Sequence, residues 1–171
     1  MQKITPVIRL LESEDIPEIA EAFHQLGWKK PAFQYERYLR EQSLGLRHVF
    51  VAFVNGEFTG HLTICWHSLY EPFQKENIPE IADFNVLPKF RRQRIGTQLM
   101  DLAESTIASV NPVAGIGVGL DHDYGAAQRL YVLRGYAPDG RGLHYRDHYI
   151  QYGEQINVDD DLVLHLTKEL N

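Results

Sequence analysis

Hydrophobic residues change their spacing several times along this chain, and each change indicates a different kind of element. Residues 5–11 carry the short apolar run of a strand. Over residues 13–28 apolar side chains recur every three or four positions, which is the period of an amphipathic helix. Residues 31–45 continue with a second helical pattern that ends at a glycine. The chain therefore begins with a strand and two helices.

The pattern then takes the period of strands. Residues 48–54 and 57–66 are rich in β-branched and aromatic side chains, and the Asn-Gly pair at 55–56 between them predicts a hairpin turn. Residues 80–86 predict a further strand that stops at a Leu-Pro pair. The middle of the chain is therefore β-structure.

The second half alternates between the two periods. Residues 94–110 and 124–135 have helical spacing, and residues 113–120 alternate glycine with branched apolar residues, as strands do. Residues 143–150 and 162–170 supply closing strands. The whole pattern predicts an α/β (α+β) fold with a mixed central sheet of about six to seven strands flanked by about four helices.

Length and composition fit a single domain over residues 1–171, with 44% hydrophobic residues and one cysteine, Cys65. One cysteine cannot form an internal disulfide, which suits a reducing compartment. The amino terminus lacks the apolar stretch of roughly 7–15 residues found in signal peptides. No window approaches the ~18 consecutive apolar residues of a membrane span. We expect a cytoplasmic protein with no membrane partner.

The chain is acidic overall, but positive charge is concentrated at one place. The net charge is −6, which argues against nucleic acid as a partner, yet Arg91, Arg92 and Arg94 share one turn where a helix begins. Arginines there oppose the helix dipole at a cost of roughly a few tenths of a kcal/mol each. A strand, a turn and a helix with unpaired first amides can bind an anion, and Gly96 would let it approach. The turn predicts a phosphate-bearing ligand, with a solvated basic turn as the alternative.

Residues 86–100, V-L-P-K-F-R-R-Q-R-I-G-T-Q-L-M, resemble the acyl-CoA-binding motif of the GNAT superfamily of N-acyltransferases. That motif reads V-x-P-x-x-[RQ]-x-x-G-x-[GA] and is followed by a helix. Arg94 departs from it, because the family has its first glycine there, and its side chain must point away from the diphosphate or clamp it. The matching residues are Val86, Pro88, Arg91 and Gly96.

A second stretch, residues 126–136, is similar to the later helix and strand of the same family, A-x-x-L-Y-x-x-x-G-[FY]. The two motifs follow in the family's order, about 35 residues apart, and the resemblance spans nearly the whole chain. Tyr124 stands where the family often has an asparagine. The matches are Leu130, Tyr131, Gly135 and Tyr136.

The resemblance implies direct transfer of an acetyl group from acetyl-CoA, as co-substrate and without a metal, to a primary amine of a small molecule or protein. It implies that first-turn amides grip the diphosphate, with Arg91 and Arg92 adding charge, and that a strand edge pairs with the pantetheine arm. The cofactor-binding residues would be Phe84, Asn85, Val86, Arg91, Arg92, Gln93, Arg94, Ile95, Gly96 and Thr97.

Two catalytic residues follow from the resemblance. Tyr131 matches the family's general acid. A phenol of pKa ~10 is a weaker acid than a thiol of ~8.5 by roughly 2 kcal/mol, so a shared hydrogen bond is the safer description. Glu80 aligns with a glutamate that some members use as base. Asp83, expected on the opposite face of the strand, and a water chain or deprotonation in solution are the alternatives.

Some alternatives remain open at the level of sequence. The glycines of residues 113–120 could make room for the cofactor or allow close packing. The amine pocket is expected among residues 142–152, residues 67–80 and Trp28, and the acidic charge favours cationic acceptors. A non-catalytic acyl-CoA sensor on the same fold is the second functional hypothesis, and the protein would be a monomer or homodimer.

Overall fold

The structure, a computed structural model, describes residues 5–170. Residues 1–4, which open the segment used for the signal-peptide expectation, lie outside the described residues, as does residue 171. The described strands form one sheet in the order β1-β2-β3-β4-β5-β8-β6-β7. They are β1 (Val7–Leu10), β2 (Arg47–Val54), β3 (Glu57–Cys65), β4 (Glu80–Val86), β5 (Val113–Gly119), β6 (Ala137–Tyr145), β7 (His148–Tyr149) and β8 (Leu162–Glu169).

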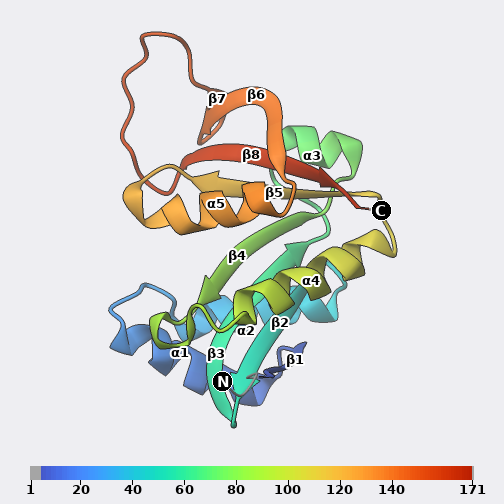
Figure 1. Ribbon diagram of the computed structural model, residues 1–171, viewed down its shortest axis with the longest axis vertical. Coiled ribbons are helices and arrows are strands. Elements are labelled where there is room, and N and C mark those ends of the chain that lie inside the picture. Colours follow the sequence, from blue (N-terminus) through green and yellow to red (C-terminus); the bar gives the residue numbers. More distant parts are fainter. Residues whose placement is uncertain (1–4, 171) are drawn as a thin grey trace.

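Helices cover both faces of this sheet. Figure 1 shows α4 crossing one face of the β2–β4 half, with α1 and α2 behind that half. Along β2 the side chains alternate accordingly, since Phe50 packs in the core cluster with α4 and Val49 packs in the cluster with α1 and α2. The α-helices are α1 (Ile16–Gln25), α2 (Ala32–Ser43), α3 (Glu71–Glu76), α4 (Ile95–Ala108) and α5 (Gly125–Leu133).

The predicted class and element order are confirmed, but residues 5–170 hold eight strands and five α-helices, more than expected. Residues 143–150 were expected as one strand and instead turn back on themselves. Tyr145 of β6 pairs with His148 of β7, and Arg146 between them takes a φ of 55°. The additional helix, α3, has six residues, which is too short to display a helical period.

The sheet opens between β4 and β5. These strands are parallel, and their pairing is limited to Glu80 with Gly115 and Ile81 with Ile116. β5 continues along β8 while β4 leaves it, and Figure 1 shows β4 turning away toward the end of the sheet that carries α1. Beyond the divergence, β4 has β3 on one side only. We call residues 84–86 the free edge of β4.

A bulge redirects β4 at the divergence. The pairing with β3 shifts by one residue between His61 and Thr63, and Asp83 takes a φ of 48°. The expected alternation therefore fails here. Glu80 lies opposite Cys65, and Asp83 contacts His61, so both acids lie on the face that α1 and α2 cover. The expectation that they occupy opposite faces was wrong, because the bulge inserts an extra residue.

Among residues 5–170, none of the helices combines the length and the apolar character that crossing a bilayer requires.

Candidate active site

The turn that follows β4 takes an unusual backbone conformation. Arg92 and Arg94 have φ of 61° and 64°, in the left-handed region that glycine adopts most easily. Arg94 is also the N-cap residue of α4, and its side chain forms no capping hydrogen bond. The position that holds glycine in the motif thus has the backbone geometry that would favour glycine, although an arginine occupies it.

The turn presents amide donors and positive charge together. The first helical hydrogen bond runs from the amide of Gln98 to the carbonyl of Arg94, so the amides of residues 95–97 precede it. Among residues 5–170, no carboxylate lies within ion-pair distance of the three arginines of the turn. Unpaired amides and uncompensated guanidinium groups favour a bound anion.

Arg91 contacts two neighbouring elements while its side chain stays exposed. Its Nε donates to the carbonyl oxygen of Val86 at 3.1 Å, on the free edge of β4. Its guanidinium carbon lies 5.9 Å from the centre of the Trp28 ring. Trp28, one of the residues expected near the amine pocket, therefore lies beside the basic turn.

Gly96 packs closely against β4. A Cβ at this position would lie 3.0 Å from the Phe84 ring and 3.4 Å from Val86. The missing side chain thus lets α4 approach the free edge. From the sequence, we expected Gly96 to let a ligand approach the backbone. The close packing against β4 is a second reason for a glycine at this position.

Tyr131 is 5% exposed and belongs to the core cluster in which Phe84 and Val86 are also packed. Burial raises the pKa of Tyr131 well above its ordinary value. The phenol therefore keeps its proton at neutral pH. Such a group can donate a hydrogen bond to a developing anion but would surrender its proton reluctantly.

Glu80 sits where β4 and β5 part. Ser68 donates a hydrogen bond to its carboxylate, and one carboxylate oxygen lies 3.6 Å from the place a Cβ on Gly117 would occupy. Burial raises the pKa of Glu80, against the opposing effects of Ser68 and the Arg47 charge. A raised pKa makes this carboxylate a better proton acceptor than an exposed glutamate.

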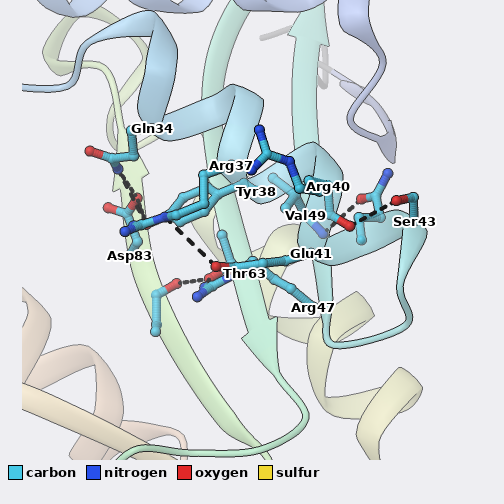
Figure 2. A network of polar contacts seen from close by, with 12 residues as sticks. Gln34, Arg37, Tyr38, Arg40, Glu41, Ser43, Arg47, Val49, Thr63 and Asp83 are labelled. Carbon is cyan, nitrogen blue, oxygen red and sulfur yellow. Dashed lines mark hydrogen bonds and ion pairs between the residues drawn. The ribbon is translucent and has the colours of Figure 1, made fainter.

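Asp83 has the opposite electrostatic environment. Burial would raise the pKa of its carboxyl group, but the charges and hydrogen bonds of His61 and Lys30 hold it well below its usual range. An acid so strongly ionised accepts protons poorly, which argues against Asp83 as the base. Figure 2 shows Gln34 and Tyr38 of α2 pointing toward it. Its partners are the ammonium group of Lys30, Gln34 Nε2 at 2.9 Å, the Tyr38 hydroxyl at 3.1 Å, His61 Nε2 at 3.1 Å and Asn85 Nδ2 at 2.9 Å.

The glycines of β5 are covered by side chains. A Cβ on Gly115 would lie 2.4 Å from the Phe73 ring, and one on Gly119 would lie 2.5 Å from the Tyr124 ring. Of the two alternatives, close packing therefore applies. Tyr124, which replaces the family's asparagine, fills that space and donates to Asp160 at 3.4 Å.

The structure brings together two of the three segments expected around the amine. The hydroxyl groups of Tyr70 and Tyr149 lie 3.1 Å apart, which joins residues 67–80 to residues 142–152. The Tyr70 ring stacks on His165 with centroids 3.5 Å apart. His165 is 6% exposed, and burial lowers its pKa to about 4, so its imidazole is neutral.

Sequence reasoning missed several residues around the two acids. Ser68 hydrogen-bonds to Glu80 from 12 positions away, and Lys30 reaches Asp83 across 53 positions. No spacing rule links such residues. Within the described part of the chain, no group of three His, Cys, Asp or Glu side chains is placed to hold a metal ion.

Comparison with known proteins agrees with the family resemblance of the two sequence motifs. The sequence model of the acetyltransferase (GNAT) family matches residues 13–136. Among curated proteins no match is found.

Solved structures share the fold. An N-acetyltransferase from Staphylococcus aureus Mu50 has a TM-score of 0.70 and 15% identity, covering 98% of this chain and 99% of that chain. The Salmonella typhimurium acetyl transferase that modifies the N-terminal serine of ribosomal protein L7/L12 has a TM-score of 0.70 and 14% identity, covering 98% and 96%. The structure of yncA from Salmonella typhimurium with its cofactor acetyl-CoA has a TM-score of 0.68 and 17% identity, covering 97% and 94%.

Proposed function

This chain belongs to the acetyltransferase (GNAT) family and is an acyltransferase, and from that premise we propose that it moves the acetyl group of acetyl-CoA directly to a primary amine. One observation carries the proposal. The strand that leaves its neighbour at Ile81 runs straight into a turn of unpaired amides and uncompensated arginines. A donor with an extended arm and a diphosphate matches that order of features.

The residues of this region fit such a donor. Amides of residues 92–97 would hold the diphosphate, with Arg91 and Arg92 adding charge. The free edge of β4, Phe84 to Val86, would pair with the amide groups of the pantetheine arm. Arg91 already donates to the Val86 carbonyl, which supports this edge as a hydrogen-bonding surface. The left-handed backbone of Arg94 compensates for the absent motif glycine.

In acetyl transfer, Glu80 and Tyr131 would each have one role. Acetyl-CoA supplies an activated thioester. Glu80, with its raised pKa, would take a proton from the acceptor ammonium so that the neutral amine can attack. Tyr131 would donate a hydrogen bond to the sulfur as the thiolate departs, because burial keeps the phenol protonated.

The acceptor is a primary amine of a small molecule or a protein. A net charge of −6 favours cationic acceptors through long-range attraction. Tyr70 meets Tyr149, and its backbone amide donates to Ser68, whose hydroxyl donates to Glu80. This link supports an amine site on the same side as Glu80.

The experiment is a thiol-release assay with acetyl-CoA across a panel of amines, combined with calorimetric titration of coenzyme A. We expect coenzyme A to bind and at least one amine to raise thiol release above the rate without amine. Binding of coenzyme A without thiol release for any amine would favour a non-catalytic acyl-CoA sensor. Arg94 and Tyr124, which depart from the family motifs, support that alternative. Failure to bind coenzyme A would contradict both.

Two variants assign the catalytic groups. Tyr131→Phe should lower turnover by about 100-fold while leaving acetyl-CoA affinity nearly unchanged, since the phenol acts only on the leaving thiolate. An equal loss of affinity and turnover would make Tyr131 structural.

Glu80→Gln should remove the fall in rate on the acidic side of the pH–rate profile, since a base loses activity as pH falls through its pKa. An unchanged profile would place the base elsewhere.

A further inference from the structure

Asp83 interrupts β4 two residues beyond its last pairing with β5. Its φ of 48° lies in a region that residues other than glycine adopt at an energetic cost, so surrounding contacts must hold it there. On the opposite face the next residue, Phe84, packs against the first turn of α4 at Gly96. The bulge therefore sets the position of the free edge relative to the basic turn.

The contacts that hold Asp83 come from four places in the fold. Lys30 belongs to the α1–α2 segment, residues 26–31, and the other donors come from α2, β3 and β4 itself. The side chains of Asp83 and Lys30 are 14% and 19% exposed. The Asp83 carboxylate thus connects the α1–α2 segment to the bulge in β4.

The same segment is also linked, through Arg91, to the far end of the free edge. Trp28 lies beside Arg91, and Arg91 donates to the Val86 carbonyl. Lys30 and Trp28 therefore fasten the α1–α2 segment on both sides of the free edge, at Asp83 and at the basic turn. A displaced bulge would change both the edge and the segment.

Asp83 is poorly suited to other tasks. Five donors occupy its two carboxylate oxygens, which leaves little capacity for a ligand. The Lys30 ammonium group and the His61 imidazole face it and hold the pKa of its carboxyl group low, so it does not act as a base.

We propose that Asp83 is a positioning residue for acyl transfer, which holds the free edge of β4 and the α1–α2 segment in the one arrangement that aligns donor and acceptor. The proposal rests on the proposed function, because it assumes that the donor's arm lies on the free edge. The diphosphate would be gripped by residues 92–97, away from Asp83. Loss of Asp83 should therefore change turnover more than donor affinity.

The test is Asp83→Asn, measured with an amine that the wild-type protein acetylates. We expect kcat at saturating donor and amine to fall by about tenfold or more, since small misplacements of reacting groups have large effects on rate. The dissociation constant for acetyl-CoA should change by less than about threefold, and the shape of the pH–rate profile should persist. Loss of the acidic limb in this variant would make Asp83 a base and overturn the proposal.

Two further variants separate positioning from stability. Asp83→Asn with Lys30→Met removes both charges of the pair, which should restore much of the lost stability while kcat stays low. Glu104→Gln is the matched control, because Glu104 of α4 is also an ion-paired carboxylate, with a side chain 11% exposed. Its partners are Arg134 at the end of α5 and Lys168 of β8. Glu104→Gln should lose stability and keep kcat. A kcat that recovers in the double variant, or falls equally in Glu104→Gln, contradicts the proposal.

Amide hydrogen exchange tests the same claim without turnover. Asp83→Asn should speed exchange in residues 84–86 and 26–31 relative to the wild-type protein and to Glu104→Gln. Unchanged exchange in both segments overturns the positioning role. If the wild-type protein acetylates no amine, the proposed function fails, and the exchange result still decides whether Asp83 holds these segments.

Discussion

Replacing Arg94 with glycine should stabilise this protein, an unusual outcome for removing a large side chain. The φ of 64° at Arg94 costs a residue with a Cβ about 1–2 kcal/mol. Glycine removes that cost but gains freedom in the unfolded chain, worth about 0.5–1 kcal/mol. The Arg94 side chain is exposed, so little contact is lost. The midpoints of the two ranges give a net gain of about 0.75 kcal/mol, or roughly 1.5–3 °C in Tm for a chain of this size.

Urea denaturation and thermal melting of Arg94→Gly measure this gain, with Arg91→Gly as control. Arg91 shares the turn and is exposed, but its φ of −66° suits any residue, so glycine there should not stabilise. Equal effects of the two substitutions, or a clear loss of stability in Arg94→Gly, would refute the argument from backbone conformation. The affinity of Arg94→Gly for coenzyme A separates two possible roles of Arg94. A loss of affinity within about threefold fits donation by the backbone alone, whereas a larger loss means that the guanidinium group clamps the phosphate.

Two other substitutions test the packing and the electrostatics. Gly115→Ala should lose about 2–3 kcal/mol in urea denaturation, because the new methyl would lie 2.4 Å from the buried Phe73 ring; unchanged stability would mean that the ring can move aside. Burial would raise the pKa of Glu104, but the hydrogen bonds and charges of Arg134 and Lys168 hold it below its ordinary value of about 4.5. Its stabilising contribution is therefore present above that pH and lost as pH falls through the lower folded value. Stability of Glu104→Gln should thus depend less on pH below about 4.5 than that of the wild-type protein, and parallel curves would contradict this pairing.

The periodic elements and the basic turn were predictable because local pattern determines them. Residues 94–110 show a helical period, and α4 runs over Ile95–Ala108. The arginines, together with the order of strand, turn and helix and with Gly96, predicted an anion site there, and that site stays a prediction. The left-handed backbone of Arg94 could not be predicted from the sequence, because arginine has no preference for that conformation.

Departures from regular geometry escaped prediction for a physical reason. Side-chain alternation assumes an unbroken pleat, so the bulge at Asp83 reversed the expected face. The hairpin at Arg146 lacks the glycine or asparagine that would have indicated a turn. The partners of Asp83 are up to 53 positions distant and meet only because the fold places α2 and the α1–α2 segment beside β4. Tertiary contacts of that kind leave no periodic signal.

The central claim is that the main-chain donors after β4 hold the diphosphate of the acyl donor. A crystal structure with coenzyme A bound at saturation tests it most directly. The account predicts phosphate oxygens within hydrogen-bonding distance of the amides of residues 95–97, with the pantetheine arm along residues 84–86. Coenzyme A bound elsewhere, with this turn left empty, would contradict the account.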